Sequence, residues 1–226
     1  MSIHKLTVLL ILIVLTSCNN QMVDSKTSKK TLGFQEKQNS VVQDLQGFIP
    51  EGYAIIRSGG KFNKVKADLN TDGIYDYVVL LSNGMESKDY ADATRVTLAI
   101  FEGQTDGTFK LKNQTGNLTY AFIYTAVEQR LKVINNTVII LRHQSMRHDY
   151  ELKFKYEADY DDYMLIGSDY NNYGNAMHIG AGNVSTNFVF GVRNETIDYI
   201  KTTYLNTVLQ PISVVNADNV YDLISD

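Results

Sequence analysis

The sequence predicts a mainly β domain, built of antiparallel hairpins and preceded by an N-terminal helix (α+β). The sheet is either open, a sandwich or a partly closed barrel. Several short segments alternate apolar and polar residues with a period of two, as strands with one face in water do. Turn-forming pairs such as Asn83-Gly84 and Asn135-Asn136 lie beside these segments. Hydrophobic residues make up 44% of the chain, which is enough for a core.

The N-terminus carries the features of an export signal. Lys5 provides a positive charge, and the run from Leu6 to Leu15 is apolar apart from Thr7. This run is too short to span a bilayer, which needs roughly 20 apolar residues, and it lies where a secretory signal has its apolar region. The sequence LTSC at 15–18 then resembles the lipobox of bacterial lipoproteins. The resemblance implies cleavage before Cys18 and lipidation of that cysteine, although serine at 17 is less usual than glycine or alanine.

Cys18 is the only cysteine, so it forms no internal disulfide. An ordinary signal peptide or an uncleaved anchor with an incidental cysteine is the alternative. Several acyl chains together give stable anchoring, whereas one chain binds a membrane only marginally. We therefore expect a signal peptide at 1–17, a polar flexible tether at 18–34 and one globular domain at 35–226. The predicted location is the bacterial cell envelope, lipid-anchored at the outer membrane on its periplasmic or surface face.

Residues 35–46 are predicted to form the N-terminal helix. Its apolar stripe consists of Val41, Val42 and Leu45, followed by Phe48 and Ile49. Gly47 and Pro50 end it. The stripe is expected to dock on the core, and a helix lying on the membrane is the alternative.

Strands are expected from there on. The segment 150–156 alternates most strictly, with Tyr150, Leu152, Phe154 and Tyr156 on one face. The other expected strands lie at 53–56, 76–82, 95–101, 108–112 and 163–170, with hairpins at 131–143 and 185–200. We expect the first of these hairpins to turn at Asn135-Asn136 and the second at 191–194. A short helix is expected at the end of the chain.

The segment DLNTDGIYD at 68–76 predicts a calcium site. Calcium prefers roughly six to eight oxygen ligands, and a tight loop presents side-chain oxygens from its first, third, fifth and ninth positions. Asp68, Asn70, Asp72 and Asp76 occupy those positions, and Ile74 offers its backbone carbonyl at the seventh. Carboxylates this close repel one another in the absence of a cation. The alternative is a plain Asp/Asn/Gly turn without an ion.

The loop departs from an EF-hand, because Val79 stands where the twelfth-position glutamate belongs. A further ligand must therefore come from elsewhere in the fold or from water. The pattern D-x-N-x-D-G-x-x-D resembles the calcium loops of FG-GAP-type hairpins, but a single copy cannot build a propeller. IPEGY at 49–53, the Asp68 loop and the segment 150–170 also resemble single-copy lipoproteins of uncharacterised function, which implies location and β content but no activity. We expect a structural calcium ion rather than a catalytic one.

Other candidate groups are less specific. The residues 157–163 are acidic but lack the glycine and the spacing of an ion loop, which favours a hairpin turn. His143 and His148 are five residues apart, a spacing that on one strand places the rings on opposite faces and disfavours a shared zinc. Tyr170 and Tyr173 stand among polar amides and form a possible surface for a sugar or a protein.

No recognisable catalytic motif is present, and the net charge of −4 without a basic patch argues against a nucleic-acid partner. The expected function is a non-enzymatic envelope lipoprotein with a calcium-stabilised β domain that binds a protein or a glycan. The alternative is an envelope hydrolase with a carboxylate pair assembled from distant residues. A cleft that holds such a pair away from the Asp68 loop would favour the hydrolase.

Overall fold

The computed structural model describes residues 44–58, 60–83, 95–118, 126–174, 177, 180–196 and 200–225. The chain divides into two compact units, 1–42 and 43–226, and all described residues belong to the second. The predicted signal peptide, the tether with Cys18 and residues 35–43 of the predicted helix lie outside them. The last residues of that predicted helix belong to a 3-10 helix, η1 (Asp44–Phe48).

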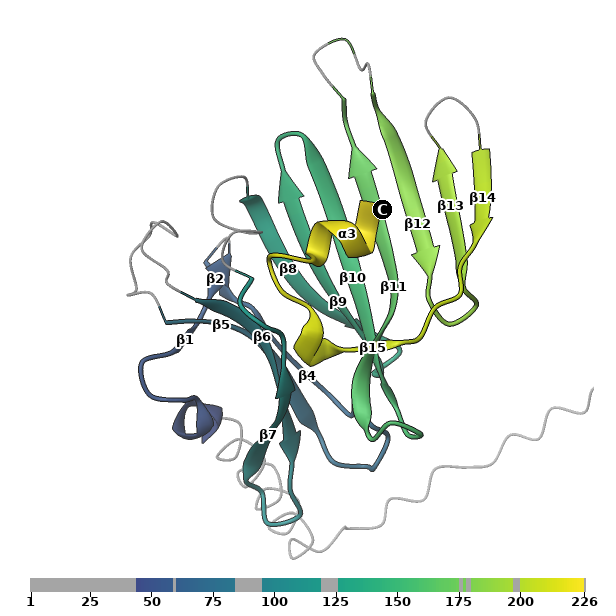
Figure 1. The fold of residues 1–226 in the computed structure, drawn as a ribbon. Coiled ribbons are helices and arrows are strands. Elements are labelled where there is room, and N and C mark those ends of the chain that lie inside the picture. The colour runs from purple at the N-terminus through teal and green to yellow at the C-terminus, as the bar shows by residue number, and fades with distance from the viewer. Residues whose placement is uncertain are drawn as a thin grey trace, which may run out of the picture. The chain divides into compact units, whose positions relative to one another are not determined.

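The described residues form antiparallel sheets and few helices, which confirms the mainly β prediction, and they close no barrel (Figure 1). The first sheet contains β1 (Ala54–Ile55), β4 (Lys64–Ala67), β5 (Asp76–Ser82), β6 (Val96–Gly103) and β7 (Phe109–Gln114). Its order is β1-β5-β6-β7, and β4 pairs with the edge of β5 that β1 also uses. A small hairpin of β2 (Arg57–Ser58) and β3 (Lys61–Phe62) separates β1 from β4.

The second sheet is a meander in the order β14-β13-β12-β11-β10-β9-β8. Its strands are β8 (Ala126–Ile134), β9 (Val138–Ser145), β10 (His148–Glu157), β11 (Asp162–Asn172), β12 (Gly182–Asn187), β13 (Val192–Thr196) and β14 (Ile200–Tyr204). The chain then returns through β15 (Gln210–Pro211), which pairs with β11, to η3 (Ile212–Val214) and α3 (Val220–Ser225). The predicted C-terminal helix is thereby confirmed.

The two sheets share one core, to which the C-terminal segment also contributes. The strand at 150–156 buries its predicted face, because Tyr150, Leu152 and Phe154 are at most 1% exposed and Tyr156 packs against the core. From the first sheet, Leu80 and Ile100 belong to the same cluster. Each such side chain contributes about 1.5–3 kcal/mol on burial.

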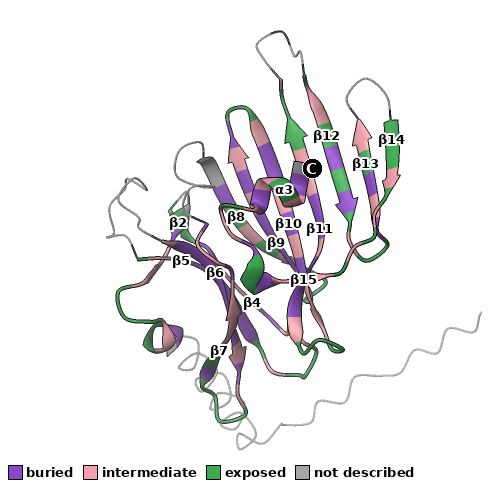
Figure 2. Cartoon of the chain, viewed as in Figure 1, coloured by how far each residue is buried: buried purple, intermediate pink, exposed green. Residues whose placement is uncertain are grey.

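The two sheets differ in their other face. Along β5 every residue from Asp76 to Leu81 is buried, so both faces of this strand are covered (Figure 2). Phe48 of η1 lies on the far face, where its ring centroid is 5.8 Å from that of Phe109. In β10, by contrast, Glu151, Lys153 and Lys155 are only partly buried. The second sheet therefore has an outer face that is polar and open.

The turns test the local predictions. Asn135 and Asn136 have φ values of 52° and 62°, so the β8–β9 turn is where it was predicted. The prediction of a turn at 191–194 is wrong, because Val192–Thr196 is strand β13 and the turn occupies 188–191. The apolar residues Val189 and Phe190 led to the strand prediction, yet they are 53% and 77% exposed in that turn.

Candidate functional site

The Asp68 loop connects β4 to β5 and is held by its own side chains. Asp68 accepts a hydrogen bond from the Gly73 backbone N–H at 3.1 Å, and Asp72 accepts one from Ile74 at 2.7 Å. Asn70 likewise accepts one from the Asp72 N–H at 3.1 Å. Gly73 has a φ of 86°, a left-handed conformation that favours glycine. The side-chain oxygens of Asp68, Asn70 and Asp72 therefore accept hydrogen bonds from backbone N–H groups of the same loop.

Asp76, at the ninth loop position, is fully buried. Its two carboxylate oxygens accept backbone N–H bonds from Leu69 at 2.8 Å and from Gly103 at 3.0 Å. Burial raises the pKa of Asp76 to about 6, against the lowering effect of these two hydrogen bonds. Gly103 permits the approach of β6, because a Cβ there would lie 2.3 Å from the carbonyl oxygen of Tyr75.

Glu102, the neighbour of Gly103 on β6, lies beside the loop and was not identified from the sequence. The Asn70 side chain is within hydrogen-bonding reach of its carboxylate, and the charge of Asp72 acts on it. Burial raises the pKa of Glu102, while Lys112, whose Nζ lies 3.9 Å away, opposes that shift. Glu102 is therefore a carboxylate from outside the loop that lies beside it. It is 34 residues after Asp68 in the sequence, and no local pattern points to it.

The donor set of this region fits a hard cation, since it consists of carboxylate, amide and carbonyl oxygens. Asp68 Oδ1 is buried and has no hydrogen-bond partner. Within the described part of the chain, however, no three His, Cys, Asp or Glu side chains converge in a way that could hold a metal ion.

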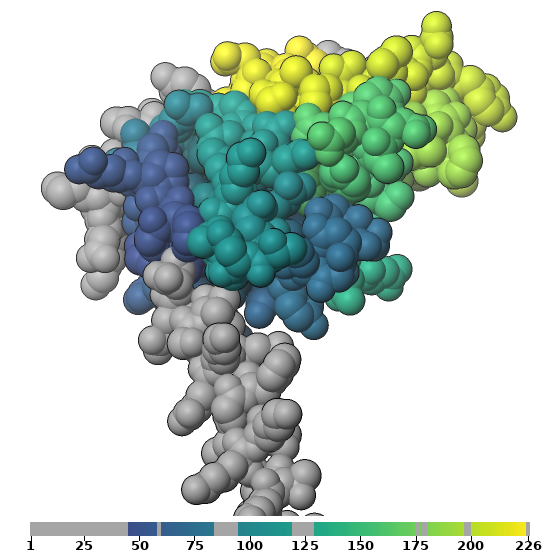
Figure 3. All heavy atoms as spheres, turned by 90° about the horizontal axis from the view of Figure 1, so that it is seen from below, coloured from purple at the N-terminus to yellow at the C-terminus, as the bar shows by residue number. Residues whose placement is uncertain are grey.

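The acidic stretch 157–163 contains the β10–β11 turn at 158–161, as predicted, and it ties the two sheets together. Asp161 accepts a hydrogen bond from Lys112 of β7 at 2.8 Å, and Asp162 accepts two from Asn113 at 2.7 and 2.8 Å. Seen from below, the blue β4–β5 loop, the teal β6–β7 hairpin and the green β10–β11 turn gather at this end (Figure 3). This end is a structural junction between the sheets.

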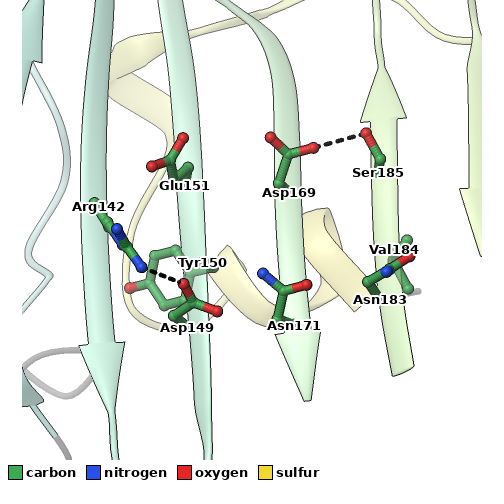
Figure 4. A pocket seen from close by; sticks show the side chains of 9 residues that line it. All are labelled: Arg142, Asp149, Tyr150, Glu151, Asp169, Asn171, Asn183, Val184 and Ser185. Carbon is green, nitrogen blue, oxygen red and sulfur yellow. Dashed lines mark hydrogen bonds and ion pairs between the residues drawn. The ribbon is translucent and has the colours of Figure 1, made fainter. Parts of the chain in front are cut away.

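A depression of about 410 Å³ lies on the outer face of the second sheet, away from the Asp68 loop (Figure 4). It crosses four neighbouring strands, β9 to β12. Its lining consists of Arg142, Asp149, Tyr150, Glu151, Asp169, Asn171, Asn183, Val184 and Ser185. The side chains that point outward are almost all polar, and they meet through strand register: Glu151 is opposite Asp169, which is opposite Ser185.

Each carboxylate of this depression has a cationic neighbour. Arg142 Nη2 lies 2.8 Å from Asp149 Oδ2, and Lys132 Nζ lies 3.4 Å from Glu151 Oε1. Asp169 pairs with Lys153 and also accepts a hydrogen bond from Ser185 at 2.6 Å. The formal charges around the depression therefore balance. Asp149 Oδ1 and Arg142 Nε, however, are both buried without a hydrogen-bond partner.

The two tyrosines predicted to share a surface lie on different faces. Tyr170 is the cross-strand neighbour of Tyr150 and lies 5.9 Å from His148, on the side covered by α3. Tyr173 is 38% exposed, and its hydroxyl is within hydrogen-bonding reach of Asp149. Only Tyr173 therefore adjoins the polar depression.

The prediction that His143 and His148 face opposite ways is wrong, because the chain reverses between them. His143 lies near the end of β9 and His148 begins β10, so both rings lie on one face with centroids 5.9 Å apart and planes at 28°. Stacked rings turn their faces toward each other, whereas the nitrogen lone pairs lie in the ring planes. His143 also stacks on Tyr150 at 4.9 Å. Burial lowers the pKa of His143 to about 4 and also lowers that of His148.

No helix in the described ranges is long and apolar enough to cross a bilayer. Comparison of the chain with protein-family models, with curated proteins and with solved structures finds no match.

Proposed function

We propose that this chain is a lipid-anchored cell-envelope protein whose calcium-stabilised β domain binds a neutral glycan. The binding site is the depression on the outer face of the second sheet. Its ligand would lie across four strands, against the amides of Asn171 and Asn183 and the hydroxyl of Ser185, with Tyr173 beside Asp149. Planar amides, carboxylates and hydroxyls with a neighbouring aromatic ring suit a sugar, because it carries many hydroxyls and an apolar ring face.

The observation that carries this proposal is the pair of orphaned atoms at Arg142 and Asp149. Arg142 Nε is a donor without an acceptor, and Asp149 Oδ1 is an acceptor without a donor. A buried polar atom without a partner costs about 1–3 kcal/mol. A hydroxyl group donates and accepts at once, so a ligand hydroxyl can pair with either atom once that side chain turns into the depression. The balanced charges of the lining favour a neutral ligand over an acidic or basic one.

Calorimetric titration of the full chain with a panel of neutral and acidic oligosaccharides tests this proposal. We expect a neutral sugar to bind, and Asp149→Asn to weaken that binding at least tenfold. Asn194→Ala, which changes the same face outside the depression, is the matched control and should bind as the wild type does. Absence of binding to every sugar, or equal binding by Asp149→Asn, would contradict glycan binding and leave a protein as the expected partner.

The proposed calcium ion is structural. Asp68, Asn70, Asp72 and Asp76 would supply side-chain oxygens and Ile74 its carbonyl, and the ion would neutralise the carboxylates that the fold brings together. The orphaned Asp68 Oδ1 and the proximity of Glu102 support this proposal. Glu102 would take the place of the missing twelfth-position acid.

Thermal unfolding with calcium and with a chelator tests the ion. An ion that binds only the native state raises stability by mass action, about 2.7 kcal/mol at one hundred times its Kd. We expect a higher Tm in millimolar calcium, and Asp72→Ala should lose the difference. Asp106→Ala, at a turn outside the loop, should keep it. An unchanged wild-type Tm at millimolar calcium would leave the plain turn as the correct interpretation.

The proposed anchor is tested by fractionation. Cys18→Ala should leave the membrane fraction and incorporate no labelled lipid. Lipid incorporation by that variant would contradict the lipobox assignment, whatever the domain binds.

A hydrolase is the second candidate, and one observation favours it. Glu151 and Asp169 stand directly opposite on neighbouring strands, away from the Asp68 loop, as a carboxylate pair for glycoside hydrolysis would. Against it, both carboxylates have a cationic neighbour, whereas a general acid must hold a proton. Release of reducing sugar by the wild type and its loss in both Glu151→Gln and Asp169→Asn would establish the hydrolase instead of simple binding.

A further inference from the structure

The second sheet ends at β14, whose outer edge pairs with no other strand of the described ranges. Two large apolar side chains are exposed on this strand, Ile200 at 74% and Tyr204 at 83%. Both belong to the outer face of the sheet, because Ile200 is opposite Thr196 and Tyr204 is opposite Val192. An open edge with exposed apolar residues is a template for pairing with another strand.

The direction of the backbone groups on β14 follows from its pairing with β13. The Leu205 N–H donates to the Gly191 carbonyl at 2.7 Å, so residues two and four positions earlier, Thr203 and Lys201, also bond toward β13. The N–H and C=O groups of Ile200, Thr202 and Tyr204 consequently point outward. These are also the three residues whose side chains share the outer face.

This arrangement is complementary to itself. If two copies of β14 pair in antiparallel orientation with Thr202 opposite Thr202 of the second copy, Ile200 comes opposite Tyr204 in both halves. Each of the three residues then forms hydrogen bonds through both of its outward backbone groups. The apolar side chains cover each other across the junction, where aromatic and β-branched residues pair favourably.

Charge does not oppose the pairing. The one charged residue of β14 is Lys201, which lies on the opposite face, and its Nζ is 3.7 Å from Glu195 of its own copy. Protected edges usually carry an unpaired lysine, a proline or a bulge, and none of these occurs at the three outward positions of β14.

We propose that two copies of this chain associate through β14, forming a two-fold dimer with a continuous sheet. The same patch serves both copies, so the contact closes at two and does not grow into a fibre. Antiparallel pairing places the two-fold axis perpendicular to the sheet, and both outer faces therefore point the same way. The two depressions would then bind one extended ligand with avidity, a consequence that rests on the proposed function.

A cysteine at the symmetry axis tests the dimer directly. Opposed residues of a hydrogen-bonded antiparallel pair have Cα atoms about 5.5 Å apart, within the usual range for a disulfide. We expect Thr202→Cys, in intact cells that express the full chain, to give a reducible species of twice the mass under mild oxidation. Asn194→Cys, one strand further in on the same face, is the matched control, and the wild type reports any contribution of Cys18.

Thr202→Pro is the second variant. Proline removes an outward N–H but no backbone hydrogen bond to β13, so the fold tolerates it at an edge. It also removes the hydrogen bond that Thr202 Oγ1 donates to Asn194 Oδ1 of β13 at 2.8 Å, which is exposed. Sedimentation of the detergent-solubilised full chain should show a concentration-dependent dimer in the wild type and a monomer in this variant. A wild type that stays monomeric, or a Thr202→Cys variant that crosslinks no more than Asn194→Cys, overturns the proposal. Both results are independent of sugar binding.

Discussion

Asp76 and His143 are both buried and titratable, but they lie in different sheets and respond to pH in opposite directions. Burial raises the pKa of Asp76 to about 6 from 3.8, and it lowers the pKa of His143 to about 4 from 6.5. Between pH 4 and 6 the folded chain binds the Asp76 proton more tightly than the unfolded chain does. The contribution of Asp76 to the free energy of unfolding therefore falls as pH rises. The contribution of His143 to the free energy of unfolding falls as pH falls from 6.5 to 4, because the unfolded chain takes up the proton first.

The surroundings of the two groups explain why both are tolerated. Asp76 satisfies its oxygens with two backbone N–H groups, whereas His143 lies in a stack of rings with Tyr150 and His148. Removal from water disfavours the charged form of both groups, so it lowers stability at high pH for the acid and at low pH for the base. The two expected contributions to the pH dependence of stability therefore oppose each other.

The largest expected effect is on the pH dependence of the free energy of unfolding, when a variant removes one of the two titrating groups and leaves the other. Each shift of about two pKa units corresponds to about 3 kcal/mol. We expect the free energy of unfolding of the calcium-free wild type to change little between pH 4 and 6. Asp76→Asn should lose about 3 kcal/mol as pH falls through that window, and His143→Phe should gain a similar amount.

Urea unfolding at pH 4, 5 and 6.5 measures these slopes. Asp159→Asn, at an exposed site in the β10–β11 turn, is the control and should follow the wild type. Parallel curves for the two core variants would show that the opposed titrations do not exist.

The second-largest change in the free energy of unfolding is expected when both acceptor oxygens of Asp76 are removed. Asp76→Ala leaves the Leu69 and Gly103 N–H groups buried without partners, at about 1–3 kcal/mol each, partly offset because folding at pH 5 no longer requires the protonation of a carboxylate. We expect a net loss of about 3 kcal/mol at pH 5 in the free energy of unfolding. A loss no larger than that of Asp159→Ala would mean that solvent or the relaxed loop satisfies both groups.

Calcium is expected to change the titration of Asp76 but not that of His143, because the proposed ion lies beside Asp76 alone. A cation beside Asp76 favours its ionised form and lowers its pKa. In saturating calcium we expect the Asp76 contribution to the pH slope to disappear, so that the wild type behaves like Asp76→Asn and loses about 3 kcal/mol on acidification from pH 6 to 4. Identical slopes with calcium and with chelator would place the ion elsewhere or nowhere.

The smallest effect is expected at the edge of the histidine stack. Tyr221 of α3 has its hydroxyl 3.4 Å from His148 Nε2, a long hydrogen bond at a partly buried site. Tyr221→Phe keeps the ring and should cost under about 1 kcal/mol in the free energy of unfolding. A cost of several kcal/mol would show that the hydroxyl, rather than the ring, holds α3 on the sheet.

The amino-acid sequence by itself determined the features that depend on neighbouring residues. Strand β5 at 76–82, the alternation of 150–156 and the turn at Asn135-Asn136 were predicted correctly, because side-chain period and turn preference act within a few residues. The inward-turned oxygens of the Asp68 loop belong to the same class, since their hydrogen bonds span two to five residues.

Only the tertiary structure decided which strands became neighbours. It brought Glu102 to Asn70, stacked His143 on His148, moved the second hairpin turn to 188–191 and assembled the polar depression from four strands. Each of these depends on the register and order of strands, which the whole core sets and no single segment encodes. A strand carries its own alternation, but it does not carry the identity of the residue that will stand opposite.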